Sequence, residues 1–209
     1  MFRRIKIYRK IKSGEFVEAL ALLPSGENID GQDLLLRAHC FFKLLQYDKA
    51  KQDLDKAKKN KKYAYQAYNN QGYIYLEQGL WEQAISELTK AREIEPDHSF
   101  ALNNLGYAYM MTNRMEEGVQ MIENATKLNK YNYYTVRNIG IYYMLKKQYS
   151  DAIVVLEKAK ANDKTIDDID VYIAICQSKN GSNDRFSEMK QKFSDHQKNR
   201  FESLIRIFS

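Results

Sequence analysis

The sequence has 209 residues, of which 44% are hydrophobic and 29% are charged, and its formal net charge is +6. This length suits one compact domain or a short repeat array. Because 27 acidic residues dilute the positive charge, the composition does not predict a nucleic-acid-binding protein. The two cysteines, Cys40 and Cys176, lie far apart, which argues against a disulfide framework and against a zinc site.

Nothing in the sequence predicts transfer into or across a membrane. Residues 1–10 lack the apolar stretch and the small-residue cleavage site of a signal peptide. No stretch reaches the roughly 18 apolar residues that a membrane-spanning helix needs. We expect both cysteines to be buried thiols in a reducing compartment, so the predicted location is the cytoplasm.

Residues 1–30 predict a degenerate N-terminal repeat that caps the fold. The basic segment 2–12 predicts a first helix, and residues 14–23 predict a second helix in which Phe16, Ala19 and Leu23 are spaced for one face. The basic segment is amphipathic enough to contact an acidic membrane surface or an acidic partner. Capping the array is the preferred interpretation.

Residues 31–166 contain four units of 34 residues, at 31–64, 65–98, 99–132 and 133–166. Several series of residues recur at that interval, and their agreement is not expected by chance. They are Gly72, Gly106 and Gly140; Ala57, Ala91, Ala125 and Ala159; Ala50, Ala84, Gly118 and Ala152; Leu54, Leu88, Ile122 and Leu156; Phe41, Tyr75, Tyr109 and Tyr143; and Tyr47, Trp81, Met115 and Tyr149.

Each unit predicts two helices, as residues 65–98 illustrate. Gly79 separates the two helices and Pro96 ends the second one. Gly72 costs about 1 kcal/mol of helix propensity relative to alanine. A close approach of two helices at this point is the expected compensation. The core stripes at spacings of three and four are Tyr68, Gly72 and Tyr75 in the first helix and Trp81, Ala84, Leu88 and Ala91 in the second.

The units resemble the tetratricopeptide repeat, a helix–turn–helix of 34 residues, in the order of small, large and aromatic residues. The match is best over residues 65–98, whereas Lys62, Lys130 and Lys164 replace the terminal proline in the other units. The resemblance implies an all-α, right-handed superhelical solenoid of antiparallel helix pairs. It also implies a non-enzymatic adaptor or scaffold without a cofactor, in which the first helices line a concave groove for a partner protein.

Residues 167–209 predict a degenerate C-terminal repeat and a capping helix. Residues 167–181 predict another first helix, and apolar residues at helical spacing follow it. The last segment, residues 201–209, is expected to expose Leu204, Ile205, Ile207 and Phe208. Docking of this helix onto a second copy, which would make the protein a self-assembling structural component, is therefore the alternative to an adaptor.

An asparagine recurs at the period on the face of the first helices that points away from the predicted core. A carboxamide both donates and accepts, so a row of such side chains can hold the backbone of an extended peptide, and apolar neighbours can form pockets for its side chains. The row resembles the asparagine ladder of the O-linked N-acetylglucosamine transferases. The predicted partner-binding residues are Asn70, Tyr73, Phe100, Asn104, Tyr107, Met111, Tyr134, Arg137, Asn138 and Ile141.

The same pattern has a structural interpretation. Each asparagine can bridge neighbouring first helices, and the aromatic residues can pack between those helices or hold a terminal helix in the groove. No catalytic motif is present, and His39, His98 and His196 share no metal-ligand spacing, so we expect no enzyme and no metal. RNA binding by a helical-repeat surface, suggested only by charge, is the least favoured function.

Overall fold

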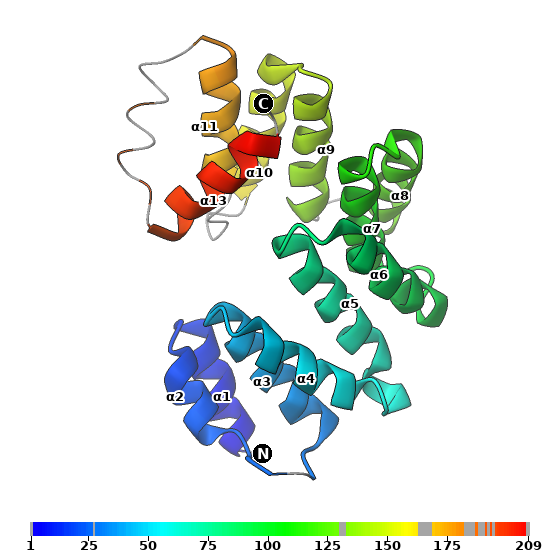
Figure 1. Cartoon of the computed structure of the whole chain (residues 1–209), viewed down its shortest axis with the longest axis vertical. Helices are drawn as coiled ribbons and strands as arrows, with labels where there is room; N and C mark the ends of the chain where they lie inside the picture. Colours follow the sequence, from blue (N-terminus) through cyan, green and yellow to red (C-terminus); the bar gives the residue numbers. More distant parts are fainter. Residues whose placement is uncertain are drawn as a thin grey trace. The chain divides into compact units, whose positions relative to one another are not determined.

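The computed structural model describes residues 2–26, 28–129, 133–162, 169–181, 187, 191, 193 and 195–207, and all regular structure in these ranges is helical. The chain forms two compact units, Met1–Arg114 and Met115–Ser209. The helices of the first unit are α1 Phe2–Lys12, α2 Phe16–Leu22, α3 Gly31–Lys43, α4 Tyr47–Ala57, α5 Lys61–Glu77, α6 Trp81–Ile94 and α7 Ser99–Met111. Those of the second unit are α8 Met115–Leu128, α9 Tyr133–Leu145, α10 Tyr149–Asn162, α11 Ile169–Lys179 and α13 Asp195–Ile207 (Figure 1).

Within each unit, consecutive helices pack as antiparallel pairs, as the periodicity predicts (Figure 1). In the first unit, α1 packs on α2, α3 on α4 and α5 on α6, and the first helices α3, α5 and α7 also contact one another in sequence. In the second unit, α9 packs on α10, α10 on α11 and α11 on α13. A first helix inside the array therefore touches its own second helix and a neighbouring helix pair, and this buries more than one face of it.

The periodic glycines allow two helices to approach closely. A Cβ atom on Gly72 would lie 2.5 Å from Cγ of Leu88, and one on Gly140 would lie 2.6 Å from Cγ of Leu156. Both leucines are fully buried. The close approach predicted at Gly72 is thus confirmed, and the structure shows the same approach at Gly140.

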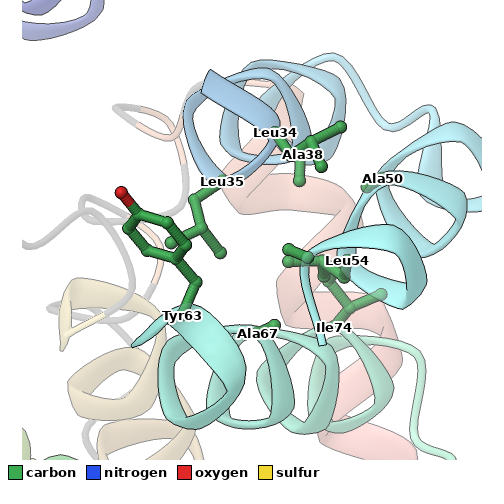
Figure 2. Packing of buried hydrophobic residues seen from close by; sticks show 9 residues of the cluster. Leu34, Leu35, Ala38, Ala50, Leu54, Tyr63, Ala67 and Ile74 are labelled. Carbon is green, nitrogen blue, oxygen red and sulfur yellow. The ribbon is translucent and has the colours of Figure 1, made fainter. Parts of the chain in front are cut away.

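One hydrophobic core of the first unit lies between α3, α4 and α5. Leu54 of α4 is completely buried, together with Ala38 of α3 and Ala67 of α5. Figure 2 shows Leu34 and Leu35 facing Tyr63 and Ile74 across this space. Small residues at the helix contacts and large residues beside them fill the interior, which is the arrangement that close packing requires.

The first and second helices of a pair are joined by a turn whose geometry recurs. A residue with positive φ ends the first helix, and this residue is Gly14, Leu45, Gly79, Asn113, Lys147 or Gly181. From Leu45 onward these positions lie 34 residues apart. At Leu45, the N–H of Gln46 donates to the carbonyl oxygen of Phe41 at 2.8 Å, and the N–H of Leu45 donates to that of Phe42 at 2.9 Å. This pair of bonds is the Schellman motif, and it also occurs at Gly14, Gly79, Asn113 and Lys147.

The N-terminal helix pair covers the free side of α3. Ile7 of α1 and Ala19 of α2 are fully buried against Leu36 and Cys40 of α3. Burial raises the pKa of the Cys40 thiol to about 11. Leu36 thereby receives the partner that a first helix at the end of an array otherwise lacks.

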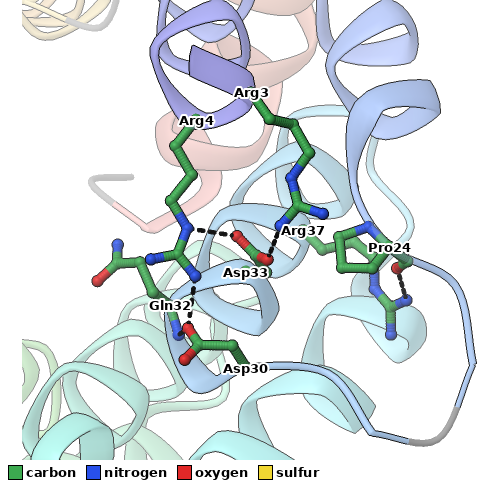
Figure 3. A network of polar contacts seen from close by, with 7 residues as sticks. All are labelled: Arg3, Arg4, Pro24, Asp30, Gln32, Asp33 and Arg37. Carbon is green, nitrogen blue, oxygen red and sulfur yellow. Dashed lines mark hydrogen bonds and ion pairs between the residues drawn. The ribbon is translucent and has the colours of Figure 1, made fainter. Parts of the chain in front are cut away.

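Ionic contacts also hold α1 against α3 (Figure 3). The Arg4 side chain donates from Nε to Asp33 at 2.9 Å and from Nη2 to Asp30 at 2.8 Å, and Arg3 donates to the other oxygen of Asp33. The hydrogen bond to Asp33 raises the pKa of Arg4. Asp33 is almost fully buried, so these two arginines balance a charge that would otherwise be costly to bury.

The C-terminal helix differs from the sequence prediction. Leu204, expected to be exposed, is buried, and Phe201 is buried with its ring 6.1 Å from that of Phe193. Ile205 is half-buried, while the Ile207 side chain and Phe208 lie outside the described part of the chain. The physical reason is that α13 packs on α11 within the same unit and buries Phe201 and Leu204 there.

Candidate partner-binding surface

Two neighbouring first helices, α5 and α7, carry six of the ten predicted partner-binding residues. They pack against each other in the first unit, and the Asn104 side chain connects them directly. Its Nδ2 donates to Oδ1 of Asn69 at 3.2 Å. Asn104 therefore ties the stack, and its acceptor is Asn69, not the Asn70 that the periodic row would suggest.

Asn70 is placed differently from Asn104. Its side chain is half-buried and makes no hydrogen bond with the part of the chain that the structure describes. A half-buried carboxamide has lost part of its hydration, and it gains when a partner supplies a donor and an acceptor. Among the periodic asparagines, Asn70 alone combines partial exposure with this unused capacity in the described residues.

Aromatic side chains flank Asn70 on its own helix and on α7. Tyr73 is half-buried, and its ring meets the edge of Phe42 on α3 at 5.5 Å. Phe100 at the start of α7 keeps 43% of its surface exposed, and its ring lies 5.7 Å from that of His98. Met111 at the other end of α7 is half-buried. These side chains present apolar surface that the unit does not cover.

Tyr107 is not on this surface, although the sequence analysis placed it there. It is almost completely buried, and its ring packs edge-on against Trp81 of α6 at 5.9 Å. The reason is that α7 packs on α6 as well as on α5, so the direction taken as outward faces a neighbouring helix. Tyr107 is a packing residue of the first unit.

The predicted residues of α9 are also mostly buried. Asn138 is 1% exposed, and Arg137 and Ile141 are buried beside it. Nε and Nη2 of Arg137 both donate to Oδ1 of Asn138 at 3.3 Å, and the guanidinium lies 5.4 Å from the ring centre of Tyr134, which is half-buried. The expectation that this face is open is wrong for these three buried residues, because α9 contacts α8, α10 and α11.

A polar cluster elsewhere on the same helices was missed by the sequence analysis. Glu87 of α6 is buried and accepts from Lys58, the residue that caps the end of α4, and from Lys90 of its own helix. Both ammonium groups lie over the ring of Tyr68, at 4.8 Å and 5.6 Å from its centre. This cluster binds α4, α5 and α6 together. The only signal for it in the sequence is Tyr68, which was assigned to the core stripe.

No group of three or more His, Cys, Asp or Glu side chains among the described residues can hold a metal ion. Cys40 and Cys176 are buried and unpaired with each other, and burial raises the pKa of the Cys176 thiol to about 12. Nor is any helix in the described ranges long and apolar enough to span a lipid bilayer.

The stacked helix pairs and the partly open face of their first helices define an all-α helical-repeat protein of the solenoid class. The family model of the tetratricopeptide repeat matches residues 65–98 and, a second time, residues 101–132. Residues 65–98 and 101–132 are therefore tetratricopeptide repeats. This repeat is a protein–protein interaction module, so the chain has an interaction or scaffold role. No curated protein sequence is significantly similar to it.

Solved structures of repeat proteins share the fold. A thermophilic TPR protein from Thermus thermophilus superposes with a TM-score of 0.68 at 19% identity, over 83% of this chain and 98% of that one. A tetratricopeptide repeat protein from Parabacteroides merdae ATCC 43184 has a TM-score of 0.63 at 15% identity, over 91% and 77%. MamA from Desulfovibrio magneticus RS-1 has a TM-score of 0.59 at 21% identity, over 78% and 94%. At these identities the likeness shows the fold alone.

Proposed function

We propose that this protein is a non-enzymatic, cytoplasmic adaptor that holds an extended peptide segment of a partner protein on the first-helix face of its N-terminal unit. The observation that carries the proposal is Asn70, a half-buried carboxamide with no hydrogen bond to the described residues. Its own helix also carries Tyr73, and Phe100 stands at the start of the neighbouring helix α7. An extended peptide exposes one N–H and one C=O per residue, which is what one carboxamide can satisfy.

The roles within this face follow from the contacts. Asn70 holds the peptide backbone, and Asn104 fixes the spacing of α5 and α7 through Asn69. Phe100 and Tyr73 contact apolar side chains of the peptide, and Met111, which is flexible, adapts to their size. Burial of Phe100 on binding supplies the largest apolar gain, since it is the most exposed of these side chains.

A selected peptide provides the test. Peptides chosen from a random displayed library on the folded protein are labelled, and their affinity is measured by fluorescence anisotropy. We expect Asn70→Ala and Phe100→Ala each to weaken binding about 10-fold or more, which is the effect of losing one good interface contact. The matched control is Ile94→Ala, which removes an equally exposed apolar side chain from α6.

Backbone recognition is tested on the peptide side. Methylation of single peptide nitrogens should reveal one position at which binding is lost in the parent, and at which Asn70→Ala causes no further loss. Binding that survives both Asn70→Ala and Phe100→Ala would place the partner on another surface of the protein. Equal losses with the Ile94→Ala control would mean that the variants act through folding and not through this face.

The structure gives the other candidate functions less support. Self-assembly through the C-terminal helix was predicted from Leu204, Ile205, Ile207 and Phe208, and of these Leu204 is buried and Ile205 is half-buried. RNA binding rested on charge alone. The general use of tetratricopeptide repeats in protein interaction favours a protein partner, with the buried thiols of Cys40 and Cys176 fitting a reducing compartment.

A further inference from the structure

The outer side of α1 carries positive charge that the fold does not use. Residues 2–12 contain six Lys and Arg side chains and no acidic residue. Arg3 and Arg4 are committed to Asp33 and Asp30 of the adjoining segment.

Lys10 is also committed. It forms an ion pair with Glu15 at the start of α2, and this contact lowers the pKa of the Glu15 carboxyl. By contrast, Lys6, Arg9 and Lys12 are exposed and form no ion pair with the described part of the chain. Packing and stability of the N-terminal pair therefore do not account for these three side chains.

Large apolar side chains lie among these cations. Phe2 is 89% exposed and Ile5 is 50% exposed, although Ile7 and Ile11 of the same helix supply its contacts with the core. At 100° per residue, Phe2, Ile5 and Arg9 lie on the side of the helix opposite Ile7 and Ile11. An isolated exposed apolar residue needs no explanation, but two of them surrounded by three unpaired cations form one surface.

We propose that this outer face of α1 binds the surface of an anionic lipid membrane, so that the adaptor can hold its partner at a membrane. Interfacial helices combine cations, which are attracted to acidic head groups, with Phe, Trp or Leu side chains that enter the boundary with the acyl chains. Phe2 and Ile5 can enter that boundary, while Lys6, Arg9 and Lys12 remain at the level of the phosphates. This attachment is peripheral and needs no membrane-spanning helix.

The composition of the face distinguishes this partner from an RNA. Sequence or shape recognition of RNA uses stacking platforms together with polar side chains that reach bases and sugars. The centre of the α1 face has no Asn, Gln, Ser or Thr that could reach bases and sugars, and Phe2 is its one aromatic side chain. Its cations stand on one exposed helix with apolar residues between them, which suits a broad, fluid, negatively charged surface.

The test uses the full chain and sedimentation with lipid vesicles. Vesicles of phosphatidylcholine alone are compared with vesicles that also contain phosphatidylserine, at low and at high salt. We expect binding only to the anionic vesicles and release by salt, because screening shortens the range of the attraction. Each cation near such a surface contributes a factor of about 5, so the variant Lys6→Gln, Arg9→Gln, Lys12→Gln should bind on the order of 100-fold more weakly.

The control is a second triple variant with the same loss of charge. Lys56→Gln, Lys59→Gln, Lys61→Gln removes three exposed lysines around the end of α4, away from α1, and it should bind almost as well as the parent. Phe2→Ser, at a side chain with almost no packing, should weaken binding several-fold without changing the circular dichroism spectrum.

Three results would overturn the proposal. One is the absence of sedimentation with phosphatidylserine vesicles at low salt. Another is an equal loss of vesicle binding in the two triple variants, because binding would then depend on the net charge of the protein and not on the α1 face. The third is a single-stranded RNA oligonucleotide that displaces the vesicles and is bound through Lys6, Arg9 and Lys12, since this would make the face a nucleic-acid site.

Discussion

Replacing Gly72 with alanine tests whether this position is small because two helices meet there. Helix propensity alone favours the substitution by about 1 kcal/mol. The new Cβ would however lie 2.5 Å from Cγ of Leu88 and 2.8 Å from its Cδ2, whereas carbon atoms in contact prefer about 3.5–4.0 Å. Leu88 is fully buried by its neighbours. Overpacking of this kind costs about 1–3 kcal/mol, so we expect Gly72→Ala to lower the free energy of unfolding by about 1 kcal/mol.

A double-mutant cycle with Leu88 separates the two contributions. Leu88→Ala alone should cost about 2–5 kcal/mol, because it leaves a cavity in the core. In that background the alanine Cβ has room, so Gly72→Ala should become stabilising, by up to about 1 kcal/mol. The unfolding free energies come from urea titrations followed by circular dichroism and by the fluorescence of Trp81, which lies on the same helix as Leu88.

The sign of the effect decides the question. If Gly72→Ala stabilises the parent protein, the gain in helix propensity is larger than the cost of the contact with Leu88. The close approach of the helices would then not explain why residue 72 is a glycine. If the substitution costs the same in both backgrounds, Leu88 is not the neighbour that resists it. The pair Gly140 and Leu156 offers an independent repetition in the second unit, where the corresponding distance is 2.6 Å.

Three further results are expected. Leu45→Gly should raise the unfolding free energy by up to about 1 kcal/mol in urea titrations, because Leu45 is exposed and holds φ at 59° without the freedom of glycine; a loss of stability would mean that its side chain packs against the unit. Asn104→Ala should lower the free energy of unfolding by about 1 kcal/mol, because Asn69 loses its hydrogen-bond donor. Asn70→Ala should change the free energy of unfolding by less than about 0.5 kcal/mol. Equal effects would contradict the different placement of the two asparagines. Burial raises the pKa of the Cys40 thiol to about 11, so Cys40 should react with iodoacetamide at pH 8 about two orders of magnitude more slowly in the native than in the urea-unfolded protein. Mass spectrometry measures the labelling, and rapid labelling of the native protein would refute the burial of Cys40.

The helix-pair architecture could be predicted because its signals are local and repeated. Gly79 was predicted to separate two helices, and α5 ends at Glu77 while α6 begins at Trp81. Pro96 was predicted to end the second helix, and α6 ends at Ile94. The division of the chain into repeats with the stated boundaries stays a prediction, as does the role of the partner-binding residues.

Burial on the first helices was harder to predict, for a geometric reason. A helical wheel drawn from Tyr68, Gly72 and Tyr75 defines one direction of contact, but a first helix inside an array meets helices on several sides. Tyr107 and Asn138 therefore lie in the interior although the wheel placed them outside. Asn70 and Asn104 occupy equivalent positions in the repeat. Only Asn104 is already hydrogen-bonded, because Asn69 on the neighbouring helix accepts from it.

The recurring turn makes the chain divisible at defined places. Its two hydrogen bonds involve only backbone atoms, so leucine, glycine, asparagine and lysine can all occupy the residue with positive φ. Removing residues 46–79 would join Leu45 to Leu80, and the same kind of turn would then lead from α3 directly into α6. Ala38 would replace Gly72 opposite Leu88. The 34-residue interval thus acts as a unit of length in which such an array can be shortened or extended without a new connection.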